Sequence, residues 1–134
     1  MRETEFRRVR DDDLPEIREL LCTYYNPGAD TQGRYFMAVE GDSVLGVVGL
    51  LRRSWYLTEL RHLYVKPELR RGGVGRFLVK NALNEIRSPL VCCTVKDGND
   101  ASLRLFESEG FRAEKRFLNR ETGNWVSLMM RQCE

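Results

Sequence analysis

The stretch Arg70-Arg71-Gly72-Gly73-Val74-Gly75 decides the fold of this chain, because it joins a strand-like run that ends at Val65 to a strongly helical segment. Glycines have no Cβ, so the backbone N–H groups of such a turn can approach an anion closely. The start of the following helix adds unpaired N–H donors and the positive end of the helix dipole. The arginines add charged, fork-shaped donors. The sequence therefore predicts a strand, a turn and a helix that together bind a phosphate-like anion.

The segments around this turn predict an α+β fold. The helix after the glycine turn carries an apolar face from Val74 to Ile86 and is followed by the apolar run Leu90–Val95. It makes a crossover from the preceding run Leu57–Val65, so these two strands should be parallel. The periodicity elsewhere predicts a strand at Glu5–Val9, an amphipathic helix through Leu14 and Tyr24, strands at Arg34–Glu40 and Val44–Leu51, a short helix at Asn99–Glu109, and a hairpin of Phe111–Leu118 with Trp125–Met130. The order β-α-β-β-β-α-β-α-β-β indicates a central mixed sheet with α/β/α layering and one parallel β-α-β step.

Length and composition favour one domain over residues 1–134. A net charge of +2 gives no reason to expect nucleic acid or a membrane surface as a partner. The charged start Met1–Glu5 lacks the apolar core of a secretory signal, and no apolar run approaches the roughly 20 residues of a membrane span, so we expect a cytoplasmic protein.

The cysteines give no metal or redox signature. Cys22, Cys92, Cys93 and Cys133 form no CxxC pair, and the single histidine cannot complete a zinc site, so no metal is expected. Cys92 and Cys93 lie in an apolar run, where they are expected to be buried and reduced.

Two common phosphate motifs are absent: the chain has no GxxxxGK[ST], and GxGxxG is not satisfied around Gly73. Arg70-x-x-Gly73-x-Gly75 after Leu63-Tyr64-Val65 instead resembles the acetyl-CoA signature of the GNAT superfamily of N-acetyltransferases. The segment Asn99-x-x-Ser102-x-x-Leu105-Phe106-x-x-x-Gly110-Phe111 is similar to a downstream motif of that family, and Arg8–Pro15 is similar to its usual first strand and helix. The resemblance covers nearly the whole chain in the right order.

The resemblance implies a GNAT-like acyl-CoA N-acyltransferase fold and acetyl-CoA as cosubstrate. The CoA pyrophosphate would rest on the amides of the turn from Arg71 to Arg76, and the pantetheine arm would pair with the backbone of Leu63–Val65 like an added strand. A backbone N–H of that strand would stabilise the tetrahedral oxyanion. The implied cofactor-binding residues are Leu63, Tyr64, Val65, Arg70, Arg71, Gly72, Gly73, Val74, Gly75, Arg76, Asn99 and Ser102.

The implied activity is transfer of the acetyl group to a primary amine by direct attack in a ternary complex, without a metal. Glu59 stands where some family members place a catalytic glutamate and is a candidate base; the alternative is a surface carboxylate paired with Arg61 or Arg53. His62 is the next candidate, although strand alternation would put it on the face opposite Glu59. Phe106 occupies the position of the family's usual tyrosine acid and has no proton to donate. Either water or a hydroxyl such as that of Ser102 or Tyr64 replaces that acid, or catalysis is weak.

The acceptor amine is poorly specified. The resemblance implies that the acceptor contacts the loop from Asn26 to Gly33 and the terminal hairpin, and Asp30 in that loop could attract a cationic amine or be merely solvated. The nearby aromatic residues either line an acceptor site or serve packing, which is the favoured interpretation; they are Tyr24, Tyr25, Trp55, Tyr56 and Trp125. The chain is expected to be a monomer or a homodimer. The competing hypothesis is an acyl-CoA-binding sensor with weak or no catalysis.

Overall fold

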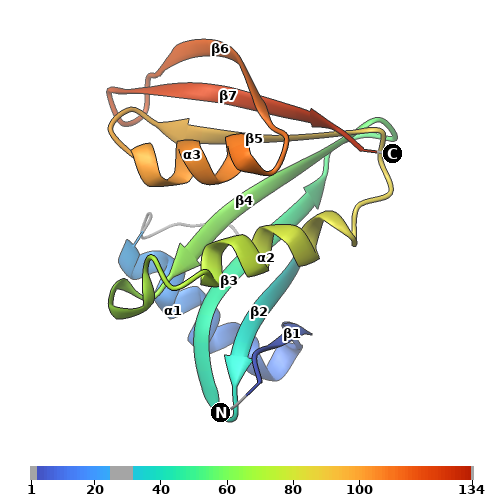
Figure 1. The fold of residues 1–134 in the computed structure, drawn as a ribbon, viewed down its shortest axis with the longest axis vertical. Coiled ribbons are helices and arrows are strands. Elements are labelled where there is room, and N and C mark those ends of the chain that lie inside the picture. Colours follow the sequence, from blue (N-terminus) through green and yellow to red (C-terminus); the bar gives the residue numbers. More distant parts are fainter. Residues whose placement is uncertain (1–2, 25–31, 134) are drawn as a thin grey trace. The chain divides into compact units, whose positions relative to one another are not determined.

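The computed structural model describes residues 3–24 and 32–133 (Figure 1). A 3₁₀ turn at Asp11–Asp13 precedes the first helix, and a second at Pro67–Leu69 follows the fourth strand. The other elements are β1 (Glu5–Arg8), α1 (Leu14–Tyr24), β2 (Arg34–Glu40), β3 (Ser43–Arg52), β4 (Leu57–Val65), α2 (Val74–Leu83), β5 (Leu90–Lys96), α3 (Asp100–Ser108), β6 (Arg112–Asn119) and β7 (Asn124–Gln132).

The strands form one mixed seven-stranded sheet in the order β1-β2-β3-β4-β5-β7-β6. The pair β4–β5 is parallel and joins Leu57–Glu59 to Leu90–Cys92, whereas β1–β2, β2–β3, β5–β7 and β6–β7 are antiparallel. The predicted α+β class, element order and parallel step are confirmed. The helix after the glycine turn ends earlier than the apolar pattern predicts. The pattern extends to Ile86, but α2 ends at Leu83, and Ile86 is buried beyond the helix end.

The chain divides into two compact units, each with its own packing, and β4 contributes residues to both. The first unit comprises Met1–Leu51 and Arg61–Glu85, and the second comprises Arg52–Leu60 and Ile86–Glu134. The expectation of a single domain over residues 1–134 stays a prediction.

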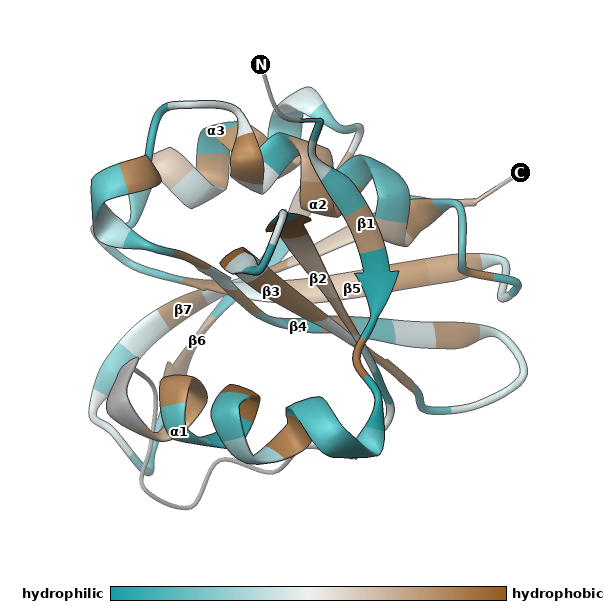
Figure 2. Cartoon of the chain, turned by 90° about the horizontal axis from the view of Figure 1, so that it is seen from below, coloured by the Kyte–Doolittle hydropathy of each residue, from teal (hydrophilic) through white to brown (hydrophobic). Residues whose placement is uncertain are grey.

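In the first unit, α1 and α2 lie on opposite faces of β2 and β3, whose ribbons are largely hydrophobic (Figure 2). Ile17 and Leu21 of α1 are fully buried in a cluster with alternate residues of β2. On the opposite face, Phe36 of β2 stacks on Phe6 of β1 with ring centroids 4.9 Å apart. This alternation explains why almost the whole of β2 is buried, since helices or aromatic rings cover both of its faces.

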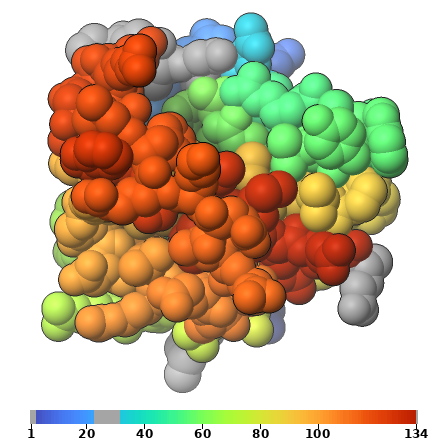
Figure 3. Space-filling model, turned by 90° about the horizontal axis from the view of Figure 1, so that it is seen from above, coloured from blue at the N-terminus to red at the C-terminus, as the bar shows by residue number. Residues whose placement is uncertain are grey.

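In the second unit, α3 buries Phe106, which packs edge to face against Phe111 at 5.2 Å. Thr58 and Ser88 are buried polar residues whose hydroxyl oxygens lie 2.6 Å apart. β6 is exposed over nearly its full length, and its orange residues are visible on the face shown in Figure 3. No helix in the described part of the chain is long and apolar enough to cross a membrane.

The expectation that both neighbouring cysteines are buried holds for one of them. All four cysteines carry free thiols, but only Cys93 is buried, and Cys92 is partly exposed. Burial alternates along β5, so neighbouring side chains lie on different faces. Burial raises the pKa of the Cys93 thiol from 9.0 to about 12. At neutral pH this thiol is a packing group and not a nucleophile.

Candidate active site

The glycine turn leads directly into α2. After β4, Leu69 N–H donates to the Lys66 carbonyl at 2.9 Å and Gly72 N–H donates to the Leu69 carbonyl at 3.3 Å, which folds the chain back on itself. Gly73 precedes the helix with φ of +87°, a left-handed conformation that glycine adopts without strain. Its carbonyl accepts the first helical bond, from Phe77 N–H at 3.0 Å. The turn therefore presents the N-terminus of a ten-residue helix.

The turn has the geometry of an anion site. Apart from Gly73 and its two chain neighbours, no atom of the described residues lies within 4 Å of the position that a Cβ on Gly73 would take, so the backbone there is open to a ligand. The first amides of a helix have no carbonyl partner within the helix and carry its positive dipole end. Arg70, Arg71 and Arg76 are exposed around this position. Arg70 Nε also donates to the Val65 carbonyl at 3.3 Å, which ties the turn to the end of β4.

The end of β4 lies unusually close to β3. A Cβ on Gly46 would lie 2.5 Å from the Tyr64 carbonyl oxygen and 3.3 Å from Val65 Cα. Lys66 N–H donates to the Leu45 carbonyl at 3.0 Å, and Tyr64 is 5% exposed. The backbone of Leu63–Val65 is therefore held firmly on one side, as a strand that pairs with a ligand requires.

In the second unit, Asn99 caps α3. Its Oδ1 accepts a hydrogen bond from Ser102 N–H at 3.2 Å, so the two residues assigned from the downstream motif share one helix cap. A pocket of about 250 Å³ lies beside this cap. Its lining residues are Val95, Lys96, Asp97, Gly98, Asn99, Asp100, Leu103 and Ser127. The structure thus places Asn99 at a hollow in the surface.

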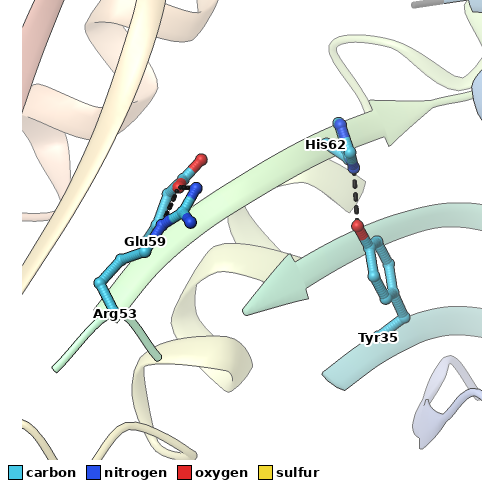
Figure 4. Close-up of polar contacts among 4 residues, drawn as sticks. All are labelled: Tyr35, Arg53, Glu59 and His62. Carbon is cyan, nitrogen blue, oxygen red and sulfur yellow. Dashed lines mark hydrogen bonds and ion pairs between the residues drawn. The ribbon is translucent and has the colours of Figure 1, made fainter. Parts of the chain in front are cut away.

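Glu59 is engaged by an arginine. Arg53 donates from Nε at 2.9 Å and from Nη2 at 2.6 Å, both to Oε1 of Glu59 (Figure 4). The sequence offered Arg53 or Arg61 as the partner, and Arg53 makes this ion pair. Before Glu59 could accept a proton through Oε1, these charge-assisted hydrogen bonds would have to break.

His62 has a backbone conformation that the strand pattern did not predict. Its φ is +52°, outside the extended region, although burial keeps the same alternation on both sides of it, at Leu60 and Tyr64. The expectation that its side chain lies on the face opposite Glu59 stays a prediction. Its Nδ1 lies 2.7 Å from the Tyr35 hydroxyl (Figure 4). Sequence reasoning missed Tyr35 altogether, because a tyrosine in an apolar strand gives no sign of a partner 27 residues away.

Phe106 is 4% exposed and packs against Phe111, so its ring is part of the core. A phenylalanine ring has no hydroxyl group, so this side chain cannot donate a proton. Tyr64, one of the two hydroxyl residues named as a replacement, is nearly buried, and Ser102 lies on the first turn of α3.

The aromatic residues on the acceptor side are largely exposed. Trp55 is 73% exposed, Tyr56 46% and Trp125 44%. The guanidinium carbon of Arg116 lies 4.5 Å from the centroid of the Trp125 ring. These three aromatics therefore belong to the surface and not to the core. Tyr25, Asp30 and most of the Asn26–Gly33 loop lie outside the described residues, as does the side chain of Tyr24.

Arg116 also donates a hydrogen bond from Nε to Oδ2 of Asp97, at 3.1 Å; Asp97 lines the pocket beside Asn99. The hydrogen bond from Arg116 holds the pKa of the Asp97 carboxyl below its usual value. Among the described residues, no group of three or more His, Cys, Asp or Glu side chains is placed to hold a metal ion.

Comparison with known proteins agrees with this geometry. Residues 2–111 match the acetyltransferase (GNAT) family, and the chain belongs to that family. The resemblance to the GNAT superfamily that the sequence shows is thereby confirmed. The N-alpha-acetyltransferase RimI of Mycobacterium tuberculosis is 30% identical over 87 residues, which cover 63% of this chain and 55% of that protein. The match thus spans about half the length of this curated relative.

Solved structures share the fold at low sequence identity. An IAA acetyltransferase from Bacillus cereus is 17% identical with a TM-score of 0.84, covering 97% of this chain and 99% of that one. A GNAT family acetyltransferase from Elizabethkingia anophelis, solved with acetyl-CoA bound, is 15% identical with a TM-score of 0.80, covering 96% and 97%. The GNAT fold expected from the sequence is confirmed.

Proposed function

We propose that this protein transfers the acetyl group of acetyl-CoA to a primary amine, by direct attack of the amine while both substrates are bound. The observation that carries the proposal is the open, left-handed Gly73 at the N-terminus of α2, flanked by exposed arginines. A CoA pyrophosphate has the charge and size that such a turn accommodates. Family membership supports the same ligand.

The proposed contacts are those that the family resemblance implies, and the local structure supports them. The amides from Arg71 to Arg76 would bind the pyrophosphate, with Gly72, Val74 and Gly75 contributing backbone. The backbone of Leu63, Tyr64 and Val65 would pair with the pantetheine arm as an added strand. Asn99 and Ser102 are proposed as further contacts to that arm.

Acetyl-CoA supplies the acetyl group as a thioester, and the chain must orient it and accept a proton from the incoming ammonium. Holding the two substrates together makes the attack effectively unimolecular. Glu59 and His62 are the two candidate proton acceptors. The CoA thiolate would leave without the tyrosine that many family members place at the position of Phe106, and water is the proposed proton donor.

The acceptor is proposed to be an amine on a small molecule or a peptide. The similarity to an N-alpha-acetyltransferase makes peptide α-amines the first class to test. Trp125 of β7 is exposed, and Arg116 of β6 pairs with Asp97, which follows β5; together they offer aromatic and charged contacts for such an acceptor.

The direct test measures release of free CoA thiol from acetyl-CoA in the presence of peptides with a free α-amine, polyamines and small amines. Thiol release that depends on the amine, with acetylated product found by mass spectrometry, would support the enzyme. Tight acetyl-CoA binding without release across the panel would instead support the acyl-CoA-binding module. Phe106, which has no hydroxyl to protonate the leaving thiolate, is the observation that favours this second function.

A further inference from the structure

The one histidine of the sequence occupies a strained position in β4. His62 has φ of +52°, in a region that costs a non-glycine residue roughly 1 kcal/mol or more. Such a conformation persists only where surrounding contacts hold it. The hydrogen bond between His62 Nδ1 and the Tyr35 hydroxyl, at 2.7 Å, is one of those contacts.

Tyr35 reaches His62 from β2 by crossing over β3. Tyr35 pairs with Gly49 in the β2–β3 ladder, and its ring lies against that glycine. A Cβ on Gly49 would lie 2.5 Å from Cε2 and 2.7 Å from Cζ of Tyr35, so any other residue at this position would block the ring. The two rings are nearly parallel, at 19°, with centroids 6.0 Å apart. The Tyr35 hydroxyl on β2 thus reaches the His62 ring on β4 because Gly49 on β3 leaves room for the tyrosine ring.

The direction of the bond to Nδ1 decides which nitrogen of His62 can act as a base, since either the phenol O–H or the Nδ1–H can be the donor. When Nδ1–H donates to the Tyr35 oxygen, the lone pair of the neutral ring is on Nε2. Protonation of Nε2 then leaves the Nδ1–H···O bond in place and makes it charge-assisted. In the opposite tautomer the proton is already on Nε2, and the ring cannot accept another there.

We propose that Tyr35 holds His62 in the Nδ1–H tautomer and that Nε2 of His62 takes the proton from the acceptor ammonium. The N–H bond of the ammonium breaks, its electron pair stays on the amine as the attacking lone pair, and the Nε2 lone pair forms the new N–H bond. His62 is then the catalytic base, Tyr35 is a positioning residue, and Glu59 with its Arg53 partner is structural. This inference rests on the proposed acetyl transfer and names the residue that activates the acceptor.

The first test is nuclear magnetic resonance of the ¹⁵N-labelled full chain, in which the single imidazole gives an unambiguous signal. In the neutral form we expect a protonated Nδ1 and an unprotonated Nε2. Tyr35→Phe keeps the ring and removes the hydroxyl, and it should abolish this preference. Tyr56→Phe, which removes the hydroxyl of a 46% exposed tyrosine, is the matched control and should leave the signal unchanged. A wild-type ring protonated on Nε2 would overturn the proposal, whatever the activity.

The second test compares acetyl transfer by His62→Gln, Glu59→Gln and Tyr35→Phe over a range of pH. We expect His62→Gln to lower kcat about 100-fold near neutrality, since general base catalysis contributes 10²–10⁴-fold. This loss should shrink as the pH approaches the pKa of the acceptor amine, because the amine then arrives deprotonated. Tyr35→Phe should lower kcat by a smaller factor, with the same dependence on pH. The affinity for acetyl-CoA should be unchanged in both His62→Gln and Tyr35→Phe.

The outcomes separate this inference from the proposed function. If the wild type is active and His62→Gln retains its rate and pH profile, the assignment of His62 is wrong while the acetyltransferase stands. If Glu59→Gln produces the pH-dependent loss instead, Glu59 is the base. If the wild type releases no CoA with any amine, the proposed function fails together with the catalytic role of His62, and the imidazole signal still tests the role of Tyr35.

Discussion

Adding a single methyl group at Gly46 should weaken acetyl-CoA binding as well as lower the stability of the fold. A Cβ there would lie 2.5 Å from the Tyr64 carbonyl oxygen and 3.0 Å from Leu78 Cδ1. Ordinary contact begins at 3.4 Å, so in Gly46→Ala the new methyl group and the Tyr64 carbonyl oxygen must move apart by about 0.9 Å. Overpacking of this kind costs about 1–3 kcal/mol. The shift falls on the Leu63–Val65 backbone that is proposed to pair with the pantetheine arm.

A displacement of that size should weaken or break one backbone hydrogen bond to the ligand. Such a bond contributes about 0.5–1.5 kcal/mol, which corresponds to a two- to tenfold increase in the Kd for acetyl-CoA. Isothermal titration calorimetry at a temperature well below the melting transition measures this Kd on folded protein, and thermal unfolding measures the loss of stability.

Leu21→Ala is the control for instability alone. Leu21 is fully buried in the α1 cluster, and its truncation should cost about 2–5 kcal/mol without moving β4. Its Kd for acetyl-CoA should equal that of the wild type. If Gly46→Ala is destabilised as expected but binds acetyl-CoA with wild-type affinity, the Leu63–Val65 backbone does not hold the ligand and this reasoning is refuted.

Three further changes test the packing of the second unit. Ser88→Ala should lower the free energy of unfolding by about 1–3 kcal/mol in urea, because it leaves the buried Thr58 hydroxyl without its 2.6 Å partner; an unchanged midpoint would show that the pair contributes nothing. Because burial raises the pKa of Cys93 from 9.0 to about 12, its neutral thiol contributes to the free energy of unfolding fully below pH 9, and this contribution is lost as the pH rises toward 12. The loss is up to about 1.4 kcal/mol per pH unit, so Cys93→Val should show a smaller decline in stability at alkaline pH. Phe106→Tyr should cost about 1–3 kcal/mol by adding a hydroxyl to a ring that packs against Phe111, with kcat unchanged; a marked rise in kcat would show that protonation of the thiolate limits the wild type.

The sequence predicted the fold well because its elements have strong local signals. The strands Arg34–Glu40 and Leu57–Val65 begin and end where the pattern placed them. The proline after Lys66 and the glycine at position 73 mark the strand end and the helix start with residues that have few conformational alternatives.

What the sequence could not show depends on contacts between distant residues. The positive φ of His62 leaves no trace in local propensity, and its partner Tyr35 is found only when the opening over Gly49 is known. The ion pair between Arg53 and Glu59 likewise became evident only once the side chains were placed. Sequence pattern therefore located the segments of the site, and packing decided which side chains within them meet.

Gly73 provides the most direct test of the central claim that the turn before α2 binds the phosphates of acetyl-CoA. Gly73 and Gly123 have φ of +87° and +77°, and at neither position does any described atom lie within 4 Å of the place that an added methyl group would take. Alanine at either site should thus cost the same strain of about 1–2 kcal/mol. Titration with acetyl-CoA should give at least a tenfold higher Kd for Gly73→Ala and a wild-type Kd for Gly123→Ala. Equal, undiminished affinity in both variants would contradict the account.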